Sequence, residues 1–259
     1  MSAPRSAYVH IPFCHRRCFY CDFAVVPLGA RAGGESGPGS TSIATYLDQL
    51  LAEIALSPPG PPLATVYIGG GTPSLLTPAQ ISAALQSLRR QFGVQQGAEI
   101  TLEMDPARFD RSTLQALCRA GINRVSLGGQ SFDDTVVESL GRRHRRHDLQ
   151  QCALWLDQAV CDGALRSWSL DLIRNLPAQT QSHWMAQLEQ ALAAKAPHLS
   201  IYDLAVEPGT VFTWRQRRGE LPLPDDDQAA ALMACTSERL ERAGFCRYEI
   251  SNYAQPGHA

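Results

Sequence analysis

Short apolar runs alternate along the chain with longer segments whose apolar positions recur at helical spacing. Each short run contains β-branched or aromatic residues and is bounded by Gly, Pro, Asp or Asn, which is typical of strands. The longer segments have the period of amphipathic helices. The pattern predicts strands at residues 7–11, 65–68, 99–104, 124–127, 168–173 and 199–204.

Capping residues mark the ends of the predicted helices. Thr77 and Pro78 are typical of a helix start, because proline at the first position loses no helical hydrogen bond. Gly244 follows the last helical pattern and provides a C-cap. Asp110 or Ser112 is expected to cap the third helix. The helices are predicted at residues 43–56, 78–92, from 110 or 112 to 121, 147–160, 181–194 and 225–243.

Six strand–helix units in series predict an α/β fold with a parallel sheet and right-handed crossovers. Periodicity does not distinguish an open sheet from a curved partial barrel. The segment 27–42 is rich in Gly, Ser and Pro, which predicts a flexible surface loop. Residues 246–259 resemble a strand and a turn and are interpreted as the start of a C-terminal region that looks truncated.

Composition and charge exclude several classes of function. The 259 residues are 44% hydrophobic and 19% charged, and the net charge of −2 gives no positive field for nucleic acid or anionic lipid. Neither a membrane-spanning apolar run nor a signal sequence is recognisable, which predicts a cytoplasmic protein. Eight cysteines, three of them clustered, indicate metal binding or redox chemistry better than a disulfide scaffold.

The cluster is the segment IPFCHRRCFYCDF, which follows the first predicted strand. Cys14, Cys18 and Cys21 bring three thiols together, and thiolate is the soft ligand of iron–sulfur clusters and of zinc. A [4Fe–4S] cluster held by three cysteines leaves one iron open, whereas a closed structural zinc site needs four ligands. Zinc remains the alternative, with His10, His15 or Asp22 as the fourth ligand.

Glycine and polar residues follow several later strands. The run Gly69–Gly71 after the second strand would let a ligand approach the backbone at the end where α/β folds bind ligands. An unpaired charge on Glu103 or Asp171 would be costly inside an apolar strand, which favours a functional role. Polar residues at the same strand ends are Glu103, Asp105, Gln130, Ser131 and Asp171, of which Asp105 is interpreted as a helix cap.

Other conspicuous residues have more ordinary interpretations. The basic run 142–147 is either a solvated helix start or an arginine clamp for a carboxylate. His10 is expected to make a hydrogen bond, and Trp168 and His198 to pack in the core. Buried structural thiols are predicted for the remaining cysteines: Cys118, Cys152, Cys161, Cys235 and Cys246.

These motifs together resemble the oxygen-independent coproporphyrinogen III oxidases and their relatives, the heme chaperones of the HemW branch, within the radical S-adenosylmethionine (SAM) superfamily. The resemblance runs from Tyr8 to His258. It is carried by YVHIPFC, CDF, GGGTPS, LEMDP, GGQSF, SLDLI, YDLAVEPGT and YEISNYA. It implies a radical SAM partial (β/α)6 barrel as the core domain, residues 1–245, before the C-terminal region at 246–259.

The resemblance also implies a ligand set. Cys14, Cys18 and Cys21 match the ligands of a [4Fe–4S] cluster whose open iron takes the amino and carboxylate groups of SAM. Residues matching contacts of this SAM are Tyr8, Gly70 and Glu103. Residues matching the surroundings of a second SAM in the oxidases are Tyr20, Gly71, Thr72, Gln130, Arg142, Asp171 and Ala205.

One position separates the two branches. The oxidases carry a further cysteine two residues after the third ligand, where this chain has Phe23. The pattern favours a HemW-like chaperone that binds heme as cargo and passes it to an acceptor protein. The alternative is a coproporphyrinogen oxidase that decarboxylates propionate side chains. Arg174 and Asn175 replace the Tyr-Gly of the family motif, which adds a charge beside the expected site.

Overall fold

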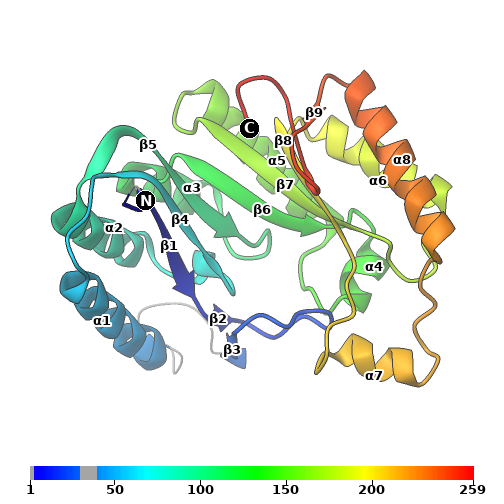
Figure 1. The fold of residues 1–259 in the computed structure, drawn as a ribbon, viewed down its shortest axis with the longest axis horizontal. Helices are drawn as coiled ribbons and strands as arrows, with labels where there is room; N and C mark the ends of the chain where they lie inside the picture. The colour runs from blue at the N-terminus through cyan, green and yellow to red at the C-terminus, as the bar shows by residue number, and fades with distance from the viewer. Residues whose placement is uncertain (1–2, 30–39) are drawn as a thin grey trace. The chain divides into compact units, whose positions relative to one another are not determined.

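The computed structural model describes residues 3–29 and 40–259, which form two compact units (Figure 1). The first unit consists of Met1–Arg17, Phe23–Val125 and Asp162–Arg166. The second consists of Cys18–Asp22, Ser126–Cys161 and Ser167–Ala259. Most of the predicted loop at 27–42 lies outside the described residues, and its last residues begin a helix instead.

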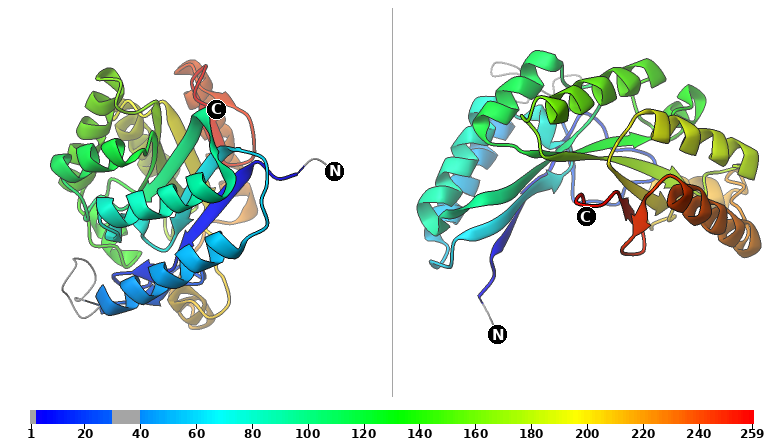
Figure 2. Two further views of the ribbon diagram at one scale, coloured as in Figure 1. Left: turned by 90° about the vertical axis from the view of Figure 1, so that its left-hand side faces the viewer. Right: turned by 90° about the horizontal axis from the view of Figure 1, so that it is seen from above.

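Three parallel strands form the sheet of the first unit. They are β1 (Ser6–Ile11), β4 (Leu63–Gly70) and β5 (Val94–Met104), with β4 in the middle. The register pairs Tyr8 with Tyr67 and Tyr67 with Thr101. Helix α2 packs between α1 and α3 on one face of these strands (Figures 1 and 2). The helices span Ser40–Leu56 (α1), Pro78–Phe92 (α2) and Arg111–Ala120 (α3), and the short helix η2 spans Pro73–Leu75.

Local sequence explains where these helices begin. Thr77 and Gln80 form a capping box at the start of α2, which satisfies two backbone N–H groups that no helical carbonyl can reach. Asp110 caps α3 by accepting from the Thr113 N–H at 2.7 Å, which confirms the first of the two predicted caps. Gly121 ends α3 with a left-handed φ of 118°.

The second unit contains five strands in the order β6-β7-β8-β10-β9. Strands β7 and β8 are parallel, as predicted, but β10 runs antiparallel to β8. The strands span Arg124–Gln130 (β6, which begins in the first unit), Ser167–Arg174 (β7), His198–Asp203 (β8), Cys246–Arg247 (β9) and Asn252–Ala254 (β10). The helices span Asp134–Ser139 (α4), Arg146–Cys161 (α5), Gln181–Ala193 (α6), Val211–Arg217 (α7) and Asp226–Arg242 (α8).

Alternation along β7 separates a polar face from an apolar one. Trp168, Leu170 and Leu172 are fully buried in the core of the unit. Ser169 and Asp171 alternate with them and hydrogen-bond to the neighbouring strand through Ser126. The predicted packing role of Trp168 is therefore confirmed.

The prediction of buried thiols is wrong for two cysteines. Cys161 and Cys246 are exposed, whereas Cys152 is buried. Cys161 is the last residue of α5, and Cys246 lies in the two-residue edge strand β9. Both positions lack a covering layer, which a local hydrophobic pattern does not reveal.

A small parallel ladder holds the first cysteine. Strand β2 (Phe13–Cys14) pairs with β3 (Val26–Pro27).

No helix in the described ranges 3–29 and 40–259 is long and apolar enough to span a membrane.

Candidate functional site

Cys14 is held against the glycine run in the first unit. Its side chain is buried at the end of the short strand β2, and the Thr72 hydroxyl donates to its sulfur at 3.5 Å. The backbone N–H groups of Gly71 and Thr72 donate to the carbonyls of Ile11 and Phe13, both at 2.8 Å. The first cysteine and the glycine motif therefore form one structure, as their positions after adjacent strands predicted.

Glycine is required at positions 70 and 71. A Cβ atom at Gly71 would lie 2.7 Å from the Phe13 carbonyl oxygen and 2.9 Å from the Cys14 sulfur. Gly70 has φ +118°, and a Cβ atom there would lie 2.7 Å from the His10 ring. His10 itself hydrogen-bonds through Nε2 to the Ala24 carbonyl at 3.0 Å, which confirms its predicted role.

Glu103 is a partly buried carboxyl group of this unit. It accepts from the Tyr67 hydroxyl at 2.9 Å and from the Gly70 N–H at 3.0 Å. Burial raises the pKa of Glu103, and the two hydrogen bonds partly oppose this because they favour the ionised form. Tyr8 stacks on Tyr67 with ring centroids 6.0 Å apart. Burial, and next the charge of Glu103, raises the pKa of Tyr8.

We expect Tyr67→Phe to raise the pKa of Glu103 further, because the variant loses a hydrogen bond to the carboxylate. Carbon-13 NMR of the glutamate carboxyl groups measures this pKa. A raised folded-state pKa means that protonation favours the folded state, so the associated stability is lost as pH rises through that pKa. Stability in Tyr67→Phe should therefore decline over a range extending to higher pH.

Tyr46→Phe provides the matched control for this titration. Its hydroxyl donates to the His10 carbonyl and makes no hydrogen bond to Glu103. An unchanged or lowered pKa of Glu103 in Tyr67→Phe would contradict the assignment.

The second and third cysteines belong to the second unit. The Cys21 N–H donates to the Cys18 carbonyl at 3.3 Å, which closes a tight turn. Phe19 anchors this turn: its N–H donates to the Leu140 carbonyl at 2.9 Å, and its carbonyl accepts from Phe212 at 3.1 Å. Tyr20 packs against the buried hydrophobic cluster that contains Leu140 and Phe212.

The described residues contain no ready group of three His, Cys, Asp or Glu side chains that could hold a metal ion. The set of cluster ligands therefore stays a prediction.

Arg142 lies beside this turn. Its guanidinium donates to the Gly128 carbonyl at 2.7 Å and lies 4.0 Å from the Cys18 sulfur. Helix α5 begins only at Arg146, so Arg142 precedes the helix. The guanidinium therefore places a positive charge beside the Cys18 sulfur. The structure thus places the Arg142 guanidinium at the turn that carries Cys18, and its contact with a ligand stays a prediction.

Asp171 and Gln130 lie on neighbouring strands of the second unit. Both carboxylate oxygens of Asp171 accept from the Ser126 hydroxyl, at 3.1 and 3.0 Å. Gln130 has a left-handed φ of 62°, which costs about 1–2 kcal/mol for a side chain other than glycine. Strain of this kind often accompanies functional sites. Ala205 is exposed in the segment that follows β8.

Two predictions need correction. Asp105 does not cap a helix: its carboxylate accepts from the Ala107 N–H at 2.9 Å in a turn, and α3 is capped by Asp110. The charge of Arg174 does not lie beside Asp171. Successive side chains of β7 point to opposite faces, and Arg174 points toward helix α8.

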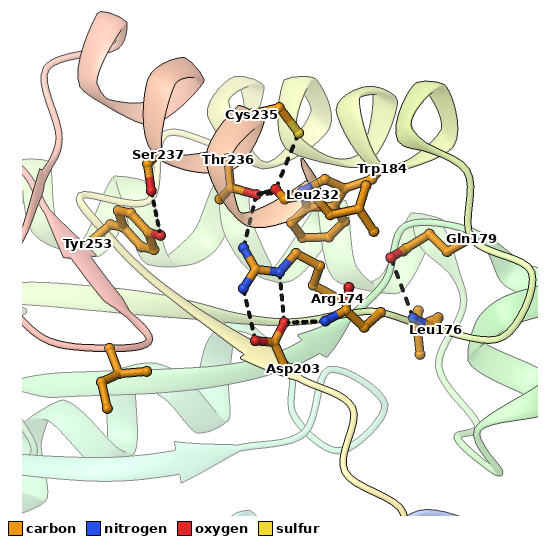
Figure 3. A network of polar contacts seen from close by, with 12 residues as sticks. Arg174, Leu176, Gln179, Trp184, Asp203, Leu232, Cys235, Thr236, Ser237 and Tyr253 are labelled. Atoms are coloured by element: carbon orange, nitrogen blue, oxygen red, sulfur yellow. Dashed lines mark hydrogen bonds and ion pairs between the residues drawn. The ribbon is translucent and has the colours of Figure 1, made fainter. Parts of the chain in front are cut away.

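Figure 3 shows where Arg174 binds instead. Its guanidinium makes a bidentate pair with Asp203, at 2.7 and 2.9 Å, and donates to the Thr236 hydroxyl at 3.3 Å. The Trp184 indole N–H donates to the same hydroxyl at 2.7 Å. This network joins β7, β8, α6 and α8. Within it, Asp203 neutralises the positive charge of Arg174.

Sequence reasoning missed the residues that hold the two carboxyl groups. Tyr67 orients Glu103, and Ser126 orients Asp171. Tyr67 lies two residues before the glycine run, on the same face of β4 as Gly69. That spacing is the one local signal by which it could have been found.

Comparisons with known proteins agree with this geometry. The family model for the radical SAM superfamily matches residues 8–176. Heme chaperone HemW of Synechocystis is 43% identical over 98% of this chain and 60% of its own length. HemW of Escherichia coli is 35% identical over 98% of this chain and 64% of its own length. The chain thus spans about three fifths of these relatives.

A solved structure gives the same result for the fold. Coproporphyrinogen III oxidase (HemN) from Escherichia coli, described as a radical SAM enzyme, superposes with a TM-score of 0.83. The sequences are 27% identical, and the match covers 99% of this chain and 56% of the oxidase. This likeness confirms the predicted α/β fold class of the radical SAM type. On the evidence of its motifs, its fold and the matching family model, the chain belongs to the radical SAM superfamily.

Proposed function

We propose that this chain is the radical SAM core of a HemW-like heme chaperone. It would bind a [4Fe–4S] cluster, SAM and heme in the cytoplasm, and pass the heme to an acceptor protein. The observation that carries this proposal is the similarity to HemW relatives over 98% of the chain, together with Phe23 at the position that distinguishes the two branches.

The donor set suits an iron–sulfur cluster. Cys14, Cys18 and Cys21 would be its thiolate ligands, and thiolate is the ligand that such clusters require. The Thr72 hydroxyl and the Arg142 guanidinium both lie within 4.0 Å of a cysteine sulfur. Donors toward sulfur stabilise the thiolate form and tune the potential of a bound cluster. When bound, the cluster supplies one-electron chemistry toward SAM.

The first unit also suits the polar end of SAM. Tyr8, Gly70 and Glu103 are the proposed contacts, and an ionised Glu103 would pair with the amino group of the ligand. The glycines keep side chains away from that space, since a Cβ atom at Gly69 would lie 2.8 Å from Glu103 Oε1. Residues proposed for a second SAM are Tyr20, Gly71, Thr72, Gln130, Arg142, Asp171 and Ala205.

We expect the anaerobically reconstituted protein to contain iron and labile sulfide, and to bind heme. Elemental analysis measures the first, and heme titration followed by absorbance measures the second. Zinc without labile sulfide would contradict the cluster assignment. A cluster-loaded protein without a Soret shift would contradict the chaperone function.

The alternative is a coproporphyrinogen oxidase, which the structural likeness to HemN favours. An assay with reductant, SAM and coproporphyrinogen III distinguishes the two functions. Repeated turnover to protoporphyrinogen with formation of 5′-deoxyadenosine would establish the oxidase. Absence of porphyrin product from protein whose cluster reduces and binds SAM supports the chaperone.

A further inference from the structure

An exposed apolar surface lies directly beside the first cysteine ligand. We call Phe23, Ala24, Val26 and Pro27 the apolar strip. Phe23 is 60% exposed and Val26 is 48% exposed. Ala24 and Pro27 are exposed as well, so four of the five consecutive residues from Phe23 to Pro27 are apolar and exposed. Exposed apolar groups that gather in one place indicate a binding surface more strongly than scattered ones do.

The strip is held firmly by its backbone. Phe13 pairs with Val26, and Cys14 pairs with Pro27, in the β2–β3 ladder. The Val26 N–H donates to the Pro12 carbonyl at 2.7 Å. Between the exposed residues, Val25 is buried and anchors the segment. The surface is therefore preorganised, which lowers the entropic cost of binding a ligand.

A cation lies at the edge of the strip. Arg17 Nη2 donates to the Phe23 carbonyl at 3.2 Å and approaches the Val25 carbonyl at 3.5 Å. Arg17 makes no ion pair with any residue in the described part of the chain. Carbonyl groups do not neutralise a guanidinium, so its charge remains available to an anion. The surface thus combines an apolar face with a positive edge.

We infer that the apolar strip binds the face of a porphyrin dicarboxylate, with Arg17 pairing one propionate. This inference rests on the proposed heme-binding function and assigns that function a place. A porphyrin has a flat apolar ring and carboxylates at one edge, which matches the chemistry of the strip. Phe23 would contact the ring, and a guanidinium suits a carboxylate by its bidentate geometry.

The test measures binding of free-base protoporphyrin IX by fluorescence polarisation. Wild type is compared with Phe23→Ser, Arg17→Gln and the control Leu56→Ser, at equal iron and sulfide content. Leu56 is 85% exposed at the end of α1, so Leu56→Ser removes an apolar side chain that is even more exposed than Phe23, elsewhere in the same unit. We expect about tenfold weaker binding in Phe23→Ser and unchanged binding in Leu56→Ser.

The dimethyl ester of the same porphyrin isolates the charged contact. Arg17→Gln should bind the diacid about fivefold more weakly and the ester as tightly as wild type does. Wild-type affinity in both Phe23→Ser and Arg17→Gln would overturn the site while leaving the chaperone function intact. Failure of wild type itself to bind porphyrin and heme would overturn the proposed function and the site together.

Discussion

Asp203→Ala is expected to lower the free energy of unfolding by about 2–3 kcal/mol. The Arg174 side chain is 3% exposed, and Asp203 is its acidic partner in the bidentate pair. Removing one partner of a buried ion pair costs about 3–5 kcal/mol, because the other charge is left uncompensated. Since the Asp203 side chain is 50% exposed, water would compensate part of this loss. Urea unfolding followed by circular dichroism measures the change.

Glu189→Ala is the matched control, because it breaks the more exposed ion pair between Glu189 and Arg239. We expect it to change stability by no more than about 1 kcal/mol. Adding Arg174→Met to Asp203→Ala should restore much of the lost stability, since the buried charge disappears. Equal effects of Asp203→Ala and Glu189→Ala would show that the pair does not hold this part of the unit together.

Gly71→Ala is expected to weaken cluster binding by about tenfold or more. The added Cβ atom would lie within 3.0 Å of the Cys14 sulfur and of the carbonyl oxygens of Pro12 and Phe13. Two of these three neighbours are backbone atoms of the two residues that precede Cys14, so the clash would displace the segment that carries Cys14. Iron and labile sulfide per chain, measured after anaerobic reconstitution, report the effect.

Gly60→Ala controls for the general effect of adding a methyl group in the first unit. Its Cβ atom would meet nothing closer than Phe92 Cδ1 at 3.8 Å, and Gly60 does not need a positive φ. Wild-type iron content is therefore expected in this variant. Full cluster occupancy in Gly71→Ala would show that the loop around Cys14 can yield without loss of the ligand.

Much of the fold was predictable because it depends on local sequence. The strand runs, the capping box at Thr77 and the cap at Asp110 act within a few residues of chain, so a linear pattern contains them. The short helices α4 and α7 were missed, since six or seven residues give too little periodicity to recognise. A strand was predicted within residues 246–259, but its antiparallel pairing with β8 was not, because β8 lies some fifty residues earlier.

Some features of the candidate site could be predicted from the sequence, and others depend on the folded structure. The sequence by itself determined the cysteine spacing, the glycine run and the carboxyl groups at strand ends, because these are matters of residue type and order. Only the tertiary structure decided which groups form hydrogen bonds with the carboxylates of Glu103 and Asp171. Register between distant strands brings Tyr67 to Glu103 and Ser126 to Asp171.

Arg174 illustrates what a sequence cannot contain. Its charge was evident from the chain, but its direction depends on strand alternation and its neutralisation on Asp203, 29 residues away. The exposure of the Phe23 side chain is likewise a property of the folded unit that its place in the chain does not reveal. Residue identity determined which chemistry is available to this protein, and long-range pairing of strands decided where that chemistry is placed, because burial and charge compensation arise only between segments that the fold brings together.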